Sequence, residues 1–278
     1  MTAAVVDLGY MMIEKQKLGD AADAAALAGI QDLINDPVQA ENIAKSYAEE
    51  NGIQNPEIII DPIHHKLTVN GQKNVPFFFA KALGYAQTTV YASATAQTKP
   101  ISGGSGFVPL AVVQQSFEYG ELYSLKYSPL DQTQGNLGAL ALGGEGASNY
   151  EDNLINGYQG TLTIGMMVPT EPGNMSGPTK KGIQDRMSLD NGVCSCYQYE
   201  TATRKCHRVM YLPVIDSLDV NGRSGVVILG FAAFYLEGVT GNGNESTVQG
   251  RFLKMVYPGD WEDSNQNQFG LYAAKLVQ

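Results

Sequence analysis

The sequence predicts an α+β protein, with a long N-terminal helix in a small α+β module followed by a β-rich, glycine-rich domain. The first observation is a helical repeat of small and apolar residues over residues 2–34. The second is the distribution of glycine, because 6 of the 31 glycines lie in the first 100 residues and 25 follow them. Short apolar runs bounded by Gly, Pro and Asn fill the later part, which is typical of β structure.

The long helix is expected to have one face made of small residues. Leu18, Ala22, Ala25 and Gly29 recur at spacings of three and four residues, which places them on one side of a helix. Small side chains allow a second backbone to approach closely. These four residues are therefore predicted to form a helix-packing surface.

The rest of the N-terminal module follows from turn and strand signals. Asn35-Asp36-Pro37 ends the first helix and begins a second one, because proline suits the first helical turn. Runs of β-branched residues around a turn predict a hairpin. The expected elements in order are a second helix over 38–50, strands at 58–60 and 67–69, a short helix over 77–83 and a strand over 88–98.

Three domains or segments are predicted from composition. Residues 1–96 form the helical α+β module, residues 97–106 form a linker rich in Pro, Ser and Gly, and residues 107–278 form the β-rich domain. A small helix is expected over 149–155, and the last strand, 270–277, is expected to return toward the start of its domain. Strands are predicted from the apolar runs at 108–113, 122–127, 137–142, 161–168, 209–214, 226–236 and 252–256.

Charge and hydropathy exclude several classes of function. The 278 residues carry 18 Lys and Arg against 28 Asp and Glu, and the net charge of −10 opposes binding to nucleic acid. We expect no nucleic-acid partner. The sequence contains no run of eighteen apolar residues, and its beginning lacks the pattern of a secretory signal.

The N-terminal third resembles the N-terminal module of TadE/TadG-like proteins of the Tad (Flp) pilus-assembly system. The resemblance extends through the segments 44–52, 75–79 and 92–96. It is strongest in the strings VVDLGY, EKQKL and AADAAALAG, at residues 5–10, 14–18 and 21–29. Residues 107–278 are similar to the glycine-rich region that follows this module in some members. The Asp-x-Ser-x-Ser metal loop of members with a von Willebrand type A domain does not occur in this sequence.

The resemblance implies a pilin-like module that is anchored in the membrane and exposed outside the cytoplasm. In the family the first helix continues upstream into a membrane segment, which this sequence lacks, so residues 5–10 would be the outer end of that helix. The expected partners are other pilus or pilus-assembly subunits, and the small-residue face would pack against their helices. The expected location is the extracytoplasmic side of the cell envelope.

The three cysteines permit more than one interpretation. A zinc site would use Cys194, Cys196, Cys206 and His207, but their spacing is not that of a zinc knuckle. A disulfide between Cys206 and either Cys194 or Cys196 suits an oxidising compartment, and we prefer this interpretation. A catalytic thiol is the third alternative.

A second candidate site is the polar loop over residues 170–179. Its glycines and prolines resemble those of ligand-binding loops, although a structural turn has the same composition. The candidate ligand residues are Glu171, Asn174, Ser176 and Thr179, with Arg186 in a small anion-binding patch. The acidic loops at 216–222 and 260–265 lack regular calcium spacing. The His64-His65 pair is expected to be a solvated turn, and Trp261 is expected to be an anchor at the edge of the core.

We therefore expect a non-catalytic component of a Tad/Flp-type pilus or its assembly apparatus, with no catalytic residues, no cofactor and no metal. The sequence contains no Gly-x-Ser-x-Gly, His-Glu-x-x-His, Walker or dinucleotide-binding motif. Two alternatives remain open at this point. One is a surface adhesin or ligand-binding module, and the other is a secreted hydrolase or thiol enzyme.

Overall fold

A computed structural model describes residues 2–127, 136–171, 174–218, 225–241, 246–263 and 268–277. The chain forms two compact units, of which the first comprises Met1–Lys99 and Ala274–Gln278 and the second comprises Pro100–Ala273. The chain thus passes from one unit to the other after Lys99 and returns after Ala273. Both α-helices and β-strands are present, and the fold class is the predicted β-rich α+β class.

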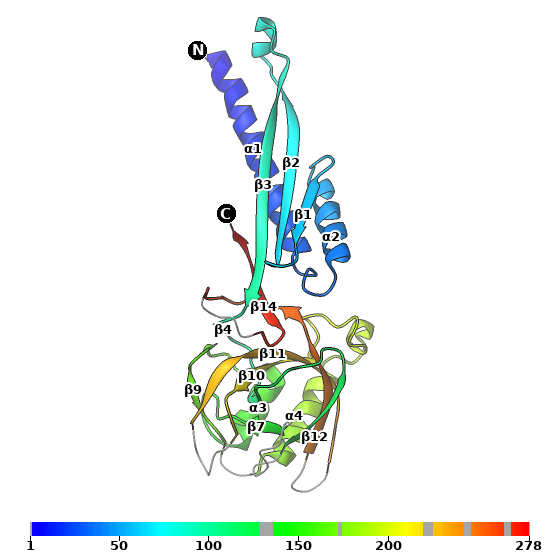
Figure 1. Ribbon diagram of the computed structural model, residues 1–278, viewed down its shortest axis with the longest axis vertical. Helices are drawn as coiled ribbons and strands as arrows, with labels where there is room; N and C mark the ends of the chain where they lie inside the picture. The colour runs from blue at the N-terminus through cyan, green and yellow to red at the C-terminus, as the bar shows by residue number, and fades with distance from the viewer. Residues whose placement is uncertain are drawn as a thin grey trace. The chain divides into compact units, whose positions relative to one another are not determined.

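The first unit packs two helices against one antiparallel sheet (Figure 1). The order helix, helix, strand, strand, short helix, strand is the predicted one. The elements are α1 (Thr2–Gly29), α2 (Pro37–Glu50), β1 (Glu57–Asp61), β2 (Lys66–Pro76), the 3-10 helix η1 (Ala80–Leu83) and β3 (Gln87–Pro100). The end of β14 (Leu271–Val277) lies next to β3 in the strand order of this sheet.

Local signals explain the boundaries of these elements. The Asp36 carboxylate accepts hydrogen bonds from the backbone N–H groups of Val38 and Gln39, and Pro37 occupies the first turn, so α2 begins where the sequence predicted. The hairpin of β2 and β3 places Leu67 opposite Ala96 and so turns alternate apolar side chains toward the helices. Burial of these alternate positions fixes the register of the hairpin.

The second unit is built around a seven-stranded sheet in the order β10-β5-β7-β6-β12-β11-β9. A further pairing of β10 with β11 closes a ring of six strands. The strands are β5 (Leu110–Val113), β6 (Leu122–Tyr127), β7 (Asn136–Ala139), β9 (Met167–Pro169), β10 (Val209–Ile215), β11 (Gly225–Thr240) and β12 (Ser246–Leu253). Short strands β4 (Gly103–Gly104) and β8 (Leu162–Thr163) form a separate pair, and β13 (Met255–Val256) pairs with the start of β14.

Strand β10 lies at the centre of this unit. All seven of its residues are buried, which explains why the run VMYLPVI is continuously apolar rather than alternating. Met210 and Leu212 face one apolar cluster together with the helices α3 (Ala147–Asn156) and α4 (Ser176–Ser188). Val209 and Tyr211 face a second cluster on the opposite side of the strand.

Helix α4 was not predicted, because the sequence was interpreted as a polar loop up to residue 179. Gly182 of α4 has a packing role, because a Cβ atom there would lie 2.8 Å from Cδ2 of Leu154 in α3. The glycine therefore allows α3 and α4 to approach closely.

The segment predicted as a linker, residues 97–106, has defined structure. It contains the end of β3 and all of β4, and the backbone N–H of Ile101 donates to the carbonyl of Leu271. The backbone N–H of Gly106 donates to the carbonyl of Tyr158. The strand predicted to return to the start of the second domain is β14, and its residues after Ala273 belong to the first unit.

Candidate functional site

The first half of α1 has an inverted distribution of polar and apolar side chains. Asp7 and Glu14 are buried on the side that faces the β2–β3 hairpin. The exposed side chains of the same segment are apolar, and we call them the outer apolar face: Val5, Val6, Leu8, Met12 and Ile13. From Lys15 onward the exposed positions of α1 are polar except for Ala24. A water-soluble helix normally shows the opposite arrangement, so this segment has the character of a contact surface.

The carboxylate of Asp7 is bound by backbone N–H groups at the tip of the β2–β3 hairpin, between the end of β2 and the start of β3. The carboxylate accepts hydrogen bonds from the N–H groups of Phe78 at 2.8 Å, Phe79 at 3.0 Å and Ala80 at 2.7 Å. These N–H groups lead into the 3-10 helix η1, whose first turn would otherwise leave its donors unpaired. The rings of Tyr10 and Phe78 meet edge to face with centroids 5.3 Å apart. Asp7 thus connects the beginning of α1 to the hairpin tip.

Glu14 links α1 to β2 through an ion pair. Its carboxylate lies 2.6 Å from Nζ of Lys73 and 2.9 Å from Nζ of Lys17. The hydrogen bonds from Lys73 and Lys17 lower the pKa of Glu14 against the opposing effect of burial. The ionised carboxylate is therefore the form that stabilises the folded unit.

The stability of the first unit should depend on pH through the ionisation of Glu14. Because the folded pKa of Glu14 lies below its ordinary value of 4.5, the contribution of the carboxylate is complete above that value and is lost as the pH falls through the folded pKa. We expect the melting temperature of the first unit to fall more steeply in acid for the wild-type chain than for Glu14→Gln. Circular dichroism of the helices between about pH 6 and about pH 3 measures both slopes. Equal slopes would contradict this role for Glu14.

The predicted helix-packing residues lie inside the first unit. Leu18, Ala22 and Ala25 are buried in its core together with Ala40 and Ala44 of α2. At Gly29 a Cβ atom would lie 2.7 Å from the Ala40 carbonyl oxygen and 2.7 Å from Cβ of Ala44. The small-residue face therefore packs against the chain's own second helix. This corrects the expectation that it meets helices of other subunits.

Three of the predicted ligand residues, Glu171, Ser176 and Thr179, are buried, whereas Asn174 is exposed. Glu171 accepts a hydrogen bond from the Gly146 N–H, and Thr179 bonds to the hydroxyl of the buried Tyr150 at 2.8 Å. Ser176 is buried at the start of α4, and the side-chain Oδ1 of Asn174 accepts a hydrogen bond from the backbone N–H of Ser176. Burial raises the pKa of Glu171, and the bond from Gly146 opposes this effect. Glu171, Ser176 and Thr179 therefore hold the turn and α4 in place, which favours the structural interpretation.

Arg186 is an internal crosslink rather than part of a surface anion site. Its guanidinium group is buried and donates only to backbone carbonyls in the contacts described for it. The acceptors are the carbonyl oxygens of His207 at 2.5 Å, Leu154 at 3.1 Å, Ile155 at 2.8 Å and Val209 at 3.0 Å. Burial lowers its pKa to about 10, so it stays protonated at neutral pH. One side chain thus joins α4, the end of α3 and the start of β10.

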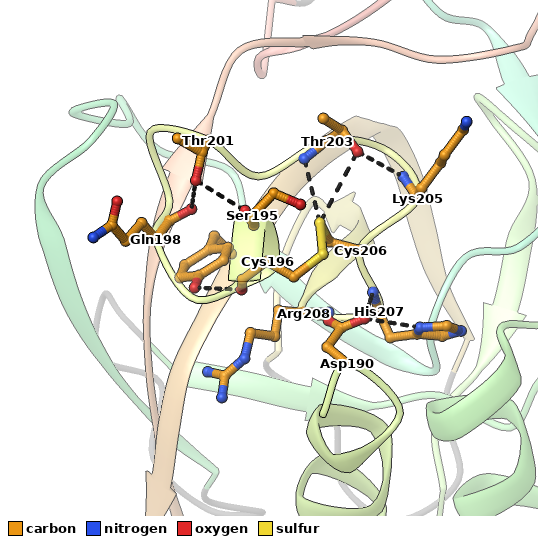
Figure 2. Close-up of a disulfide and its surroundings, with 11 residues drawn as sticks. Asp190, Ser195, Cys196, Gln198, Thr201, Thr203, Lys205, Cys206, His207 and Arg208 are labelled. Atoms are coloured by element: carbon orange, nitrogen blue, oxygen red, sulfur yellow. Dashed lines mark hydrogen bonds and ion pairs between the residues drawn. A yellow bond between two sulfur atoms is a disulfide. The ribbon is translucent and has the colours of Figure 1, made fainter. Parts of the chain in front are cut away.

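The cysteine cluster contains a disulfide between Cys196 and Cys206 (Figure 2). Both residues are buried, and the Tyr235 hydroxyl donates to the Cys196 carbonyl at 2.9 Å. A loop of this length, with a sequence separation of 10, stabilises the folded state by about 3 kcal/mol in the chain-entropy model. The side chain of Cys194 lies outside the described part of the structure.

His207 turns to a carboxylate and not to the sulfur atoms (Figure 2). Its Nδ1 lies 3.0 Å from Asp190, which also accepts the backbone N–H groups of His207 and Arg208. Burial raises the pKa of Asp190, but these hydrogen bonds outweigh it and the pKa is lowered. Because Cys196 and Cys206 are bonded to each other, they supply no thiolate for zinc or for catalysis. Within the described residues, no group of three or more His, Cys, Asp and Glu side chains is placed to hold a metal ion.

The remaining sequence candidates lie apart from one another. His64 pairs with Asp61 at 2.6 Å in the turn between β1 and β2. Trp261 is partly buried and packs against the second apolar cluster. The Asn221-Gly222 turn and most of the acidic loop around it fall outside the described residues, as do residues 264–267.

Comparison with known proteins gives a match for one part of the chain. Residues 1–32 match the family model described as Putative Flp pilus-assembly TadE/G-like. The matched segment contains the outer apolar face and both inward-facing carboxylates. No curated protein and no solved structure matches the chain. The match indicates a pilus-related role and association with the cell envelope. Among the described residues, no helix has the length and apolar character needed to cross a membrane.

Proposed function

We propose that this protein is a non-catalytic, extracytoplasmic component of a Tad/Flp-type pilus or of its assembly apparatus. The observation that carries the proposal is the match of residues 1–32, which includes the outer apolar face of α1. The N-terminal end of α1 would hold the protein at the membrane, and other pilus or assembly subunits would be its partners. The outer apolar face would make these contacts, because the small-residue face is already covered by α2.

Arrangements elsewhere in the chain favour this function over the two alternatives. An adhesin using the loop at 170–179 would need Glu171, Ser176 and Thr179 at the surface, and all three are buried. A thiol enzyme would need a free thiol near His207, whereas the two cysteines whose side chains the structure describes, Cys196 and Cys206, form a disulfide and His207 pairs with Asp190. No described feature of the second unit supports either alternative over a displayed, structural domain.

Deletion of the gene in the organism that encodes it tests this function. We expect cells without the gene to lose Flp-type pili, as counted by electron microscopy, and to recover them when the intact gene is restored. Cell fractionation should place the protein in the envelope, with its second unit accessible to protease outside the cytoplasm. Normal pili in the deletion strain, or a protein found only in the cytoplasm, would refute the proposal.

A further inference from the structure

The tip of the β2–β3 hairpin exposes a second set of large apolar side chains. Residues 76–87 form this tip, and Figure 1 shows it reaching the N-terminal end of α1 within the first unit. The exposed side chains are Phe78, Phe79, Leu83 and Tyr85. None of the four belongs to the apolar core of the unit, and Phe78 contacts only Tyr10 among the ring pairs described. The tip therefore presents apolar surface that the fold does not use.

The charge of this region distinguishes it from the rest of the chain. In the two segments that meet here, residues 2–13 and 76–87, the ionisable groups with formal charge are Asp7 and Lys81 alone. Asp7 is buried and its oxygens accept the backbone N–H groups of the tip, so Lys81 is the exposed charge. In a chain with a net charge of −10, this region of the first unit is thus apolar and weakly basic.

We infer that the hairpin tip inserts into the interfacial region of a lipid bilayer beside the outer apolar face of α1. Phe and Tyr rings with an intervening lysine suit the boundary between headgroups and acyl chains, where apolar side chains enter and a lysine reaches outward. Lys81 would add attraction to anionic headgroups. A protruding loop of 12 residues has little surface to bury against a protein partner but can enter a deformable lipid layer.

The same tip also explains the burial of Asp7. An ionised carboxylate at a lipid surface is unfavourable unless its oxygens are satisfied internally. The three backbone donors of the tip supply this, and at the same time they fix η1 so that Leu83 and Tyr85 are exposed. In cells this inference rests on the proposed anchoring of the protein in the envelope, but lipid binding itself is measured without pili.

Binding of the full chain to lipid vesicles tests the inference. The probes are vesicles of phosphatidylethanolamine and phosphatidylglycerol, with phosphatidylcholine vesicles for comparison, and the readout is co-flotation. We expect Leu83→Asp to weaken binding on the order of tenfold. The matched control is Ile63→Asp in the β1–β2 turn, since Ile63 is 83% exposed and Leu83 is 80% exposed. This control should bind as the wild-type chain does.

The position of the tip is checked by tryptophan fluorescence. Leu83→Trp should show a blue shift and quenching by brominated lipids when vesicles are added, whereas Ile63→Trp should show neither beyond the common background of Trp261. Equal vesicle binding by Leu83→Asp and the wild-type chain would overturn the inference even if pili require the protein. Loss of self-association in Leu83→Asp, with no vesicle binding by the wild-type chain, would also overturn it, because the tip would then contact a second copy.

Discussion

Replacement of Arg186 by methionine should lower the free energy of unfolding of the second unit by about 3–5 kcal/mol. Methionine keeps much of the apolar stem but removes every donor, so the carbonyls of Leu154, Ile155, His207 and Val209 lose their shared partner in a buried environment. Urea unfolding followed by the fluorescence of Trp261 measures this loss, because the single tryptophan lies in the second unit.

A control variant on the same helix distinguishes the effect of removing a buried cation from the effect of removing an exposed one. Lys181 of α4 is also a cation, but it is exposed and pairs with Glu151 and Asp185 at the surface. Lys181→Met should therefore change stability by less than about 1 kcal/mol. If the two variants were equally stable, Arg186 would not be the internal crosslink described above.

Replacement of Gly29 by alanine should destabilise the first unit by about 1–3 kcal/mol. The added methyl group would meet the Ala40 carbonyl oxygen and the Cβ atom of Ala44 at 2.7 Å, which is closer than such atoms normally approach. Helix α2 would have to move away from α1. Thermal unfolding followed by circular dichroism of the helices measures the change.

The same substitution at Gly19 should have the opposite sign. No atom lies within 4 Å of a Cβ built at Gly19, and alanine is the better helix former by about 0.5–1 kcal/mol. Gly19→Ala should therefore stabilise α1. A stabilising effect of Gly29→Ala would instead mean that α1 and α2 are not in close contact, and the small-residue face would again be available to another subunit.

Local sequence signals predicted the order of the elements from α1 to β3, but not the place of β14 beside β3 in their sheet. Helical periodicity predicted α1, Asp36-Pro37 predicted the start of α2, and β-branched runs predicted the hairpin of β1 and β2. Each of these signals acts within a few residues. The periodicity also identified the small-residue face. It could not identify the partner of that face, since a glycine such as Gly29 packs equally well against the same chain or another one.

Longer-range features were predicted less well. Gly177 and Pro178 led to the interpretation of the start of α4 as part of a loop over 170–179, and Gly182 is needed where α4 passes Leu154. The polar residues Glu171 and Arg186 suggested a ligand site, but a sequence pattern does not tell whether a polar side chain faces solvent or buried carbonyls. The run Phe77-Phe78-Phe79 was predicted to lie in a short helix over 77–83, whereas η1 begins at Ala80 and two of these rings are exposed at the tip. These outcomes depend on contacts between residues far apart in the chain.

We propose that the outer apolar face of α1, and not its small-residue face, carries the pilus-related role. The most direct test restores the deletion strain with the gene carrying Ile13→Asp on that face, with Ile63→Asp as the matched exposed isoleucine. We expect Ile13→Asp to leave the protein folded and expressed at the wild-type level but to abolish pili, whereas Ile63→Asp restores them. Normal piliation in cells expressing Ile13→Asp would contradict the claim.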